Sequence, residues 1–127
     1  MDFQAGLRSR LLAANAAPRV DWMTRPQNSA LPAITLQVIS DPRETILKGF
    51  VGARATRVQC DCWATTYAAA LVIARAAIAA LKDPVTVSGK KFGNAQVDSQ
   101  RDLGESVADG SFIHRQSVDF IIWHVGD

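Results

Sequence analysis

The sequence is poor in the side chains that carry most enzyme and metal chemistry. Its 127 residues include only two cysteines, Cys60 and Cys62, and two histidines, His114 and His124. It contains no GxxxxGK[ST] phosphate loop, no GxGxxG after a strand, no HExxH and no GxSxG. These absences remove the usual signatures of nucleotide-binding, metalloprotease and hydrolase sites. We therefore predict that the chain is not an enzyme and holds no cofactor and no metal.

Long apolar runs and a strong charge imbalance are also missing. The longest apolar tract, Ala68–Leu81, is interrupted by Arg75 and falls short of the roughly 18 residues of a membrane span. The net charge is only +2, and the basic residues are scattered, with Lys90-Lys91 as the densest pair. We expect neither membrane insertion nor tight nucleic-acid binding. The first four residues do not resemble a secretory signal, so we expect cytoplasmic synthesis and reduced cysteines.

What remains is the composition of an ordinary globular protein. Hydrophobic residues make up 48% of the chain and charged residues 20%, which excludes a disordered chain. The length fits one domain, and no repeat, low-complexity tract or linker divides it. We therefore predict a single domain over residues 1–127.

Two segments have the periodicity of helices. Residues Asp2–Asn15 place Phe3, Leu7 and Leu11 on one face, with Asp2 as the capping residue. The second helix begins after Thr65 or Thr66 and ends near Leu81. Its predicted core stripe follows spacings of four and three residues: Tyr67, Leu71, Ala74, Ile78 and Leu81.

Alternating patterns predict strands. In Ala53–Trp63, Thr56, Val58, Cys60 and Cys62 alternate with Arg57, Gln59, Asp61 and Trp63, so a one-residue slip would bury the polar set. Other predicted strands are Val20–Met23, Ala33–Ser40, Val85–Ser88, Ala95–Arg101 and Phe112–Val125. We interpret Arg43–Gly52 as a long loop that extends a hairpin, Gly89–Gly93 as a turn, and Asp102–Gly110 as a loop. The order of elements predicts an α+β fold, in which two helices pack on one face of an antiparallel or mixed sheet.

Cys60 and Cys62 are the most suggestive chemical pair. Residues two apart on a strand point to one side with their Cα atoms about 6.6 Å apart, which disfavours a disulfide between them. We interpret both as small core residues. The alternative is a metal site completed by a histidine, but His114 and His124 would lie about 33 Å apart along one strand, so at most one could reach the cysteines.

Tryptophans and arginines are the main candidates for contacts with a partner. The tryptophans could simply close the rim of the core, or some could anchor a partner, since aromatic residues and arginine are enriched in interface hot spots. The candidate interface residues are Trp22, Arg25, Arg43, Phe50, Trp63, Arg101, Arg115 and Trp123. We interpret Lys90-Lys91 as a solvated turn, with phosphate contact as the alternative.

Several segments together resemble a known family. Leu31–Ile34 opens a strand, Val58–Tyr67 joins a strand to the helix that ends at Leu81, and His114–His124 closes the chain. This arrangement is similar to the tail completion proteins of long-tailed phages, over almost the whole length. None of these motifs is catalytic, so the resemblance transfers no active-site residue.

The resemblance implies a small α+β subunit of the virion tail that assembles as a hexameric ring. Such a ring would cap the head-proximal end of the tail tube, stop its polymerisation and join the head connector, with DNA passing through its lumen. The expected partners are other copies of the chain, the major tail tube protein and a connector or stopper protein. The alternatives are another head-tail joining protein, a small metal-binding domain using Cys60 and Cys62, and a DNA-binding module using Lys90 and Lys91.

Overall fold

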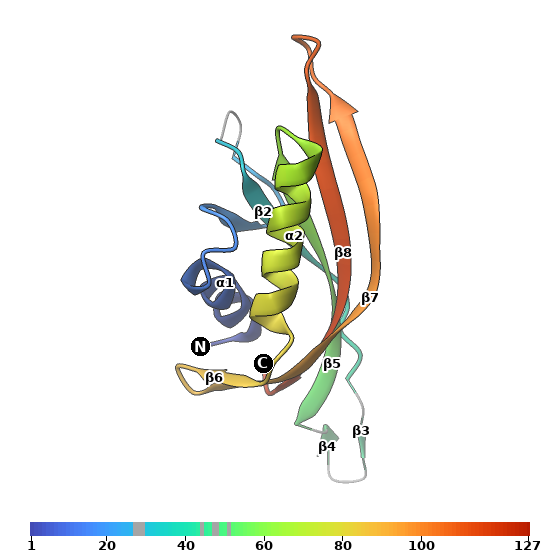
Figure 1. The fold of residues 1–127 in the computed structure, drawn as a ribbon. Coiled ribbons are helices and arrows are strands. Elements are labelled where there is room, and N and C mark those ends of the chain that lie inside the picture. The colour runs from blue at the N-terminus through green and yellow to red at the C-terminus, as the bar shows by residue number, and fades with distance from the viewer. Residues whose placement is uncertain (27–29, 44, 47–48, 51) are drawn as a thin grey trace.

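The computed structural model describes residues 1–26, 30–43, 45–46, 49–50 and 52–127 of the chain. The elements among them are α1 Phe3–Ala13, β1 Val20–Trp22, β2 Ala33–Ser40, β3 Thr45–Ile46, β4 Gly49–Phe50, β5 Ala53–Ala64, α2 Tyr67–Leu81, β6 Val85–Val87, β7 Lys90–Ser106 and β8 Phe112–Val125. Six strands form one curled sheet in the order β1-β2-β5-β8-β7-β6 (Figure 1). Strands β3 and β4 pair with each other between β2 and β5, within the segment Arg43–Gly52 that was predicted as a loop. Residues 44, 47, 48 and 51 of this segment lie outside the described residues.

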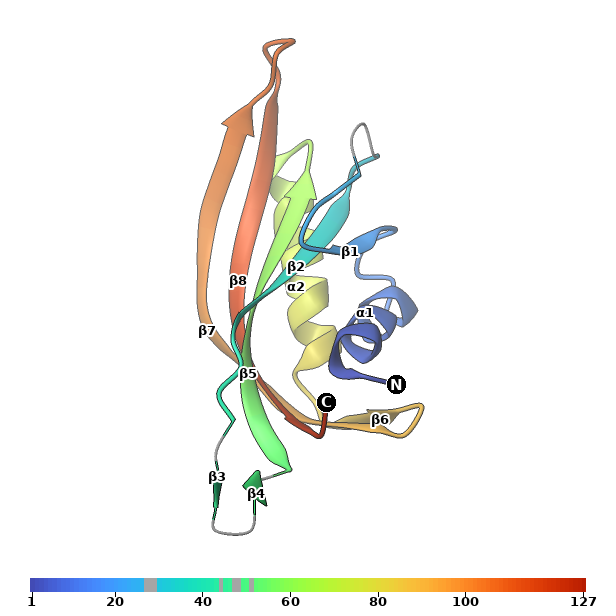
Figure 2. The same cartoon turned by 180° about the vertical axis from the view of Figure 1, so that it is seen from behind.

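The sheet is mixed, and the α+β class is confirmed. β1 runs parallel to β2, whereas every other neighbouring pair in this sheet is antiparallel. Asp2 caps α1 by accepting a hydrogen bond from the Ala5 amide, and Thr66 caps α2 in the same way through the Ala69 amide. Figures 1 and 2 show both helices on the same side of the sheet.

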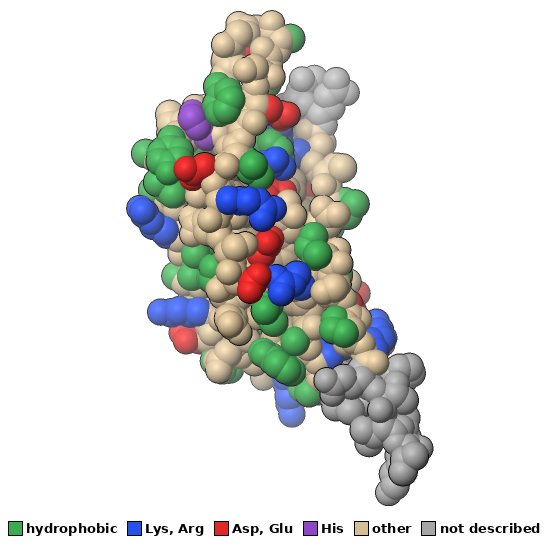
Figure 3. Space-filling view, turned by 90° about the vertical axis from the view of Figure 1, so that its right-hand side faces the viewer, with side chains coloured by type: hydrophobic (Ala, Val, Ile, Leu, Met, Phe, Trp, Pro, Cys, Tyr) green, Lys and Arg blue, Asp and Glu red, His purple; other side chains and the backbone are tan. Residues whose placement is uncertain are grey.

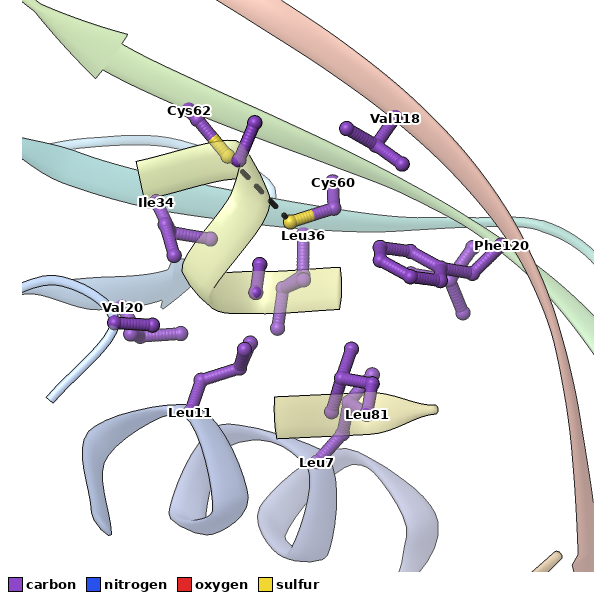
Figure 4. Packing of buried hydrophobic residues seen from close by; sticks show 14 of the residues in the cluster. Leu7, Leu11, Val20, Ile34, Leu36, Cys60, Cys62, Leu81, Val118 and Phe120 are labelled. Atoms are coloured by element: carbon purple, nitrogen blue, oxygen red, sulfur yellow. Dashed lines mark hydrogen bonds between the residues drawn. The ribbon is translucent and has the colours of Figure 1, made fainter. Parts of the chain in front are cut away.

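Alternate residues of the central strands join the helices in one hydrophobic core (Figure 4). The predicted inward positions of β5 are confirmed, because Val58, Cys60 and Cys62 are all fully buried. Phe3, Leu7, Leu11, Ile34, Leu36, Leu81, Val118, Phe120 and Ile122 are further members of this core. The alternation of β5 therefore divides the sheet into a core face and an outer face.

The predicted core stripe of α2 is confirmed at Ala74 and Leu81 but wrong at Tyr67. Tyr67 is 46% exposed, whereas the buried residues are Ala70, Ile73, Ala74, Ala77 and Leu81. Small alanine side chains make up most of the buried face, whereas the Tyr67 hydroxyl group donates a hydrogen bond to Asp102. Among the described residues, no helix is long and apolar enough to span a membrane.

The predicted turn at Gly89–Gly93 is wrong, and so is a solvated Lys90. The turn consists of Ser88 and Gly89 alone, both with positive φ, and β7 begins at Lys90 opposite Val87. Two residues with positive φ form the compact hairpin connection whose twist matches the flanking strands. Lys90 is consequently only 4% exposed, whereas Lys91 is exposed.

The predicted loop at Asp102–Gly110 is also wrong for its first half, because β7 continues to Ser106. Its residues pair in regular register with β8, from Ser99 opposite Asp119 to Ser106 opposite Phe112. This part of β7 is mostly polar and exposed, and it projects beyond the core as a strand (Figure 1).

A buried chain of polar side chains joins four segments near the two termini. The Asp41 Oδ1 atom lies 2.8 Å from the Thr56 Oγ1 atom, which lies 2.6 Å from Nε2 of His124. Nζ of Lys90 lies 2.9 Å from Nδ1 of the same ring. A carboxylate only accepts hydrogen bonds, so the Thr56 hydroxyl donates to Asp41 and accepts from the imidazole Nε2–H. The other ring nitrogen then accepts from the Lys90 ammonium group.

The same cluster holds the end of the chain against its beginning. Lys90 donates its other two N–H groups to the carbonyl oxygens of Val125, at 2.7 Å, and Gly126, at 3.2 Å. The Phe3 ring stacks on His124 with 4.2 Å between the ring centroids. The threonine, histidine and lysine of this cluster are at most 4% exposed. A substrate therefore has no access to them in this structure, which favours a structural role over acid-base catalysis.

The electrostatics keep His124 and Asp41 in the states that these hydrogen bonds require. The pKa of His124 is lowered to about 4, first by burial and then by the positive charges of Lys90 and Arg54. Burial raises the pKa of Asp41, but the Thr56 hydrogen bond and nearby arginine charges outweigh it and leave that pKa below its ordinary value. At neutral pH the imidazole is neutral and the aspartate is a carboxylate.

Two neighbouring residues of α2 test the observed helix face. Ile73 is 4% exposed, and Val72 is 64% exposed. We expect Ile73→Ala to lower the free energy of unfolding by about 2 to 5 kcal/mol, because it removes buried methyl groups and leaves a cavity. Val72→Ala should change it by no more than about 0.5 kcal/mol. Urea denaturation of both variants measures this, and equal losses would show that the helix face is assigned incorrectly.

The second prediction concerns how the free energy of unfolding changes with pH. Because the folded-state pKa of His124, about 4, lies below its ordinary value of 6.5, the unfolded chain binds this proton more readily. The contribution of His124 to stability should be complete above pH 6.5 and should fall by roughly 3 kcal/mol as the pH drops to 4. Urea denaturation across this range measures the loss. His124→Gln should reduce the loss and the control His114→Gln should keep it; the reverse pattern would contradict the assignment.

Candidate interaction surface

The outer face of the sheet carries the side chains of β2, β5 and β8 that point away from the core (Figure 3). Across this face Trp63 lies opposite Arg115, Asp61 opposite Ser117, and Gln59 opposite Asp119. Thr35, Gln37, Arg57, Ile121 and Trp123 belong to the same face. Acidic and basic side chains alternate over its middle in Figure 3. The outer face is therefore polar in its centre and differs in chemistry towards its two ends.

One end of the outer face holds an aromatic ring between arginines and a threonine. The guanidinium carbons of Arg25 and Arg115 each lie 4.9 Å from the centroid of the Trp63 ring. The indole Nε1–H donates a 3.0 Å hydrogen bond to Oγ1 of Thr35. Arg115 also lies 3.6 Å from the Asp61 carboxylate. We call these five residues the Trp63 cluster.

A cleft of about 360 Å³ opens beside the Trp63 cluster. Its lining residues are Met23, Thr24, Arg25, Thr35, Gln37, Gln59, Asp61, Trp63 and Arg115. Met23 is 65% exposed and has a positive φ of 71°. An aromatic ring with stacked arginines and an exposed methionine at the rim is the composition expected of a protein-binding surface.

The middle of the outer face carries ion pairs formed within the chain. Arg57 lies 2.7 Å from Asp98, and Arg101 lies 3.4 Å from Asp119. The Ser99 hydroxyl also donates to Asp119, at 3.1 Å. Exposed pairs of this kind each contribute no more than about 1 kcal/mol to stability. Their main effect is that these arginines already have carboxylate partners within the chain.

The other end of the outer face is apolar. Trp123 and Val125 on β8 are 51% and 49% exposed, and Ile39 on β2 is 47% exposed. In the register of the sheet, Trp123 lies opposite Ala55 and Val125 opposite Ala53, so small residues surround the tryptophan. Exposed apolar groups that lie together favour a contact with another protein.

The structure separates the predicted interface residues into three groups. It brings Arg25, Trp63 and Arg115 together in one cluster and places Arg101 and Trp123 elsewhere on the outer face. Trp22 and Arg43 lie apart from that face: the Trp22 ring packs 6.5 Å from that of Phe3, and Arg43 bridges Asp41 and Asp127. The Phe50 side chain lies outside the described residues. Whether these residues contact a partner remains a prediction.

Sequence reasoning missed several members of this surface. Asp61 could have been found, because strand alternation places it on the same face as Trp63. Met23 and Asp98 carried no such signal. Asp98 lies at an irregularity in the register between β7 and β8, so simple alternation does not predict its face.

The cysteines offer little reactivity. Cys60 and Cys62 are fully buried, with their Sγ atoms 4.0 Å apart. The hydrogen bond with Cys62 and burial raise the pKa of the Cys60 thiol well above its ordinary value, so it stays protonated and is a poor nucleophile. Within the described part of the chain, no three His, Cys, Asp or Glu side chains form a group that could hold a metal ion.

The fold also occurs in a gene transfer agent particle. A chain of the structure described as "Virion of native gene transfer agent (GTA) particle" matches with a TM-score of 0.64 and 17% sequence identity. The match covers 98% of this chain and 95% of that one. At this identity the likeness establishes a shared fold.

The sequence itself identifies the family. No curated protein matches the chain. The family model described as Tail completion protein gp17 matches residues 5–124, which is nearly the whole chain. The protein therefore belongs to the tail completion protein gp17 family and is a structural protein of the phage tail.

Proposed function

We propose that the protein is a tail terminator: a ring-forming subunit that caps the head-proximal end of the tail tube and stops its polymerisation. The same ring joins the tail to the head connector or stopper protein. Membership of the tail completion family is the observation that carries this proposal. The shared fold with a chain of a gene transfer agent virion supports it.

The physics of assembly fits a ring. A head-to-tail contact between identical subunits gives a closed ring when the rotation between them closes, and an open filament when it does not. A terminator also needs two different faces, one for the tube and one for the head. The outer face of this chain has chemically different ends, the Trp63 cluster and the apolar surface around Trp123. We propose a hexamer, as the family resemblance implies.

The charge distribution suits a lumen through which DNA slides. The net charge is +2, and arginines of the outer face pair with aspartates of the same chain. A strongly basic wall would bind phosphates by releasing counterions and would hold DNA in place. A surface whose charges are already paired lets the DNA pass without specific binding.

Deletion of the gene tests the proposed function. We expect particles without the protein to have overlong tails or tails that lack heads, because tube growth would lack its stop and its joining surface. Negative-stain electron microscopy of the particles measures tail length and head attachment. Complementation with the wild-type gene, and with the control variant Val72→Ala, should restore normal tails. Normal-length tails joined to heads in the deletion strain would contradict the proposal.

A further inference from the structure

Strand β7 forms an open edge of the six-stranded sheet over most of its length. β6 pairs only with Lys90, Lys91 and Phe92 at the beginning of β7, and no described strand lies beside residues 96–106 on the side away from β8. All of these residues are exposed. Figures 1 and 2 show β7 as the outer strand along the upper half of the molecule. The outward backbone N–H and C=O groups of such an edge are a template for a strand of another chain.

The opposite edge of the sheet is protected against such pairing. β1 has only three residues, and the Arg8 Nε–H donates a 2.8 Å hydrogen bond to the Val20 carbonyl oxygen. Where β2 extends past β1, its register with β5 shifts between Val38 and Ser40. Short strands and bulges are common means by which an edge avoids a second strand. In contrast, β7 contains no proline, lysine or register shift from Ser99 to Ser106.

Three side chains of this open edge share the outer face: Arg101, Leu103 and Glu105. Leu103 lies opposite Arg115 of that face, and residues two positions away on a strand point to the same side. Leu103 is 37% exposed. The Arg101 side chain is 47% exposed and contacts Asp119 through one nitrogen at 3.4 Å, so its other N–H groups can reach a second carboxylate. The open edge therefore presents a cation, an apolar group and an anion in that order.

This order is complementary to itself. Two copies of β7 can pair antiparallel about a two-fold axis perpendicular to the sheet, and residues opposite each other then lie on the same face. With Leu103 at the axis, it meets Leu103 of the second copy. Arg101 then meets Glu105 of the second copy, once on each side of the axis. Opposite charges and apolar groups that face each other across two strands stabilise the pair.

Neighbouring registers lack this match. With Asp102 at the axis, two carboxylates meet, and like charges directly opposite each other destabilise a strand pair. With Gly104 at the axis, Leu103 meets Glu105, and no opposite charges pair. The register centred on Leu103 is therefore favoured. It pairs residues 100–106 of each copy, all within the regular part of the strand.

We propose that two copies of the free protein pair through the open edge of β7, antiparallel and centred on Leu103. The two six-stranded sheets then form one continuous sheet across the two-fold axis. The contact is isologous, because each copy offers the same edge, and a contact of this type closes with two copies. It is separate from the head-to-tail contact that a ring requires, so it does not rest on the proposed function.

Charge reversal and charge exchange test the side-chain part of the pairing. Glu105→Arg sets two cations opposite each other at both ends of the contact, and Arg101→Glu does the same with two anions. We expect each variant to raise the dissociation constant of the dimer by about tenfold or more, because attraction is replaced by repulsion twice. The double variant Arg101→Glu/Glu105→Arg restores opposite charges and should dimerise as the wild type does.

Sedimentation velocity over a range of protein concentrations measures these dissociation constants. Arg75→Glu is the matched control, since Arg75 lies on the exposed part of α2, away from the open edge of β7. This control should leave the dissociation constant unchanged. All three substituted positions are exposed, and thermal unfolding of each variant checks that it folds.

Amide hydrogen exchange tests the backbone part of the pairing. In an edge strand, alternate residues point their N–H groups away from the sheet. We expect alternate amides of residues 100–106 to exchange freely in the monomer and to become protected in the dimer. They should stay unprotected in Glu105→Arg at the same protein concentration. Exchange measured by NMR spectroscopy at low and high concentration gives this result residue by residue.

The outcomes decide for or against the pairing. Weaker dimers of both single variants, recovery in the double variant and newly protected alternate amides would support it. A wild type that stays monomeric at its highest soluble concentration, or a double variant that does not recover, would overturn it. Rings or dimers in which these amides exchange as in the monomer would also overturn it. The proposed function is tested separately by the gene deletion, whose result does not depend on this contact.

Discussion

The register of β5 between β2 and β8 is the constraint on which the rest of the structure depends. Twelve consecutive residues of β5 pair with β8 without interruption, from Ala53 to Ala64. This register sends Cys60 and Cys62 into the core and leaves Asp61 and Trp63 on the outer face. A shift by one residue would exchange the two sets, turning the Asp61 carboxylate into the hydrophobic core and the core residues outward. The core and the candidate interaction surface are thus two sides of one strand.

Local sequence patterns predicted the elements in which residue spacing alone determines which side chains face the core. The alternation of β5, the i, i+4 spacing of α1 and the capping residues Asp2 and Thr66 all appear in the structure as expected. The α+β class followed from the order of these elements. Such features depend on neighbours within a few residues, which is the range over which periodicity carries information.

Features that depend on distant partners were not predictable in this way. Lys90 is polar and lies beside glycine, yet it is buried because His124 and two backbone carbonyl groups from the end of the chain accept all its N–H groups. The second half of β7 is polar and glycine-containing, yet it is a strand because β8 pairs with it. Arg25, Trp63 and Arg115 were each candidates, but only the fold brings them together. In α2 the predicted stripe is right at Ala74 and Leu81 but wrong at Tyr67, whose exposed hydroxyl group donates a hydrogen bond to Asp102.

The cysteines and histidines were the candidates for metal binding in the sequence, and in the structure Cys60, Cys62 and His124 are buried and pack within the fold. The two thiols are closed in the core, and the histidine with a lowered pKa is fixed between a threonine and a lysine near the termini. The exposed features are instead an aromatic cluster with two arginines, charges paired within the chain, and an apolar end of the outer face. Features of this kind favour contacts with other proteins.

Cryo-electron microscopy of the intact particle at the junction between head and tail tests the central claim most directly. The account predicts one closed ring of this chain between the last tube ring and the head connector. Density for the chain at another position in the particle, or single copies that make no contact with one another, would contradict it.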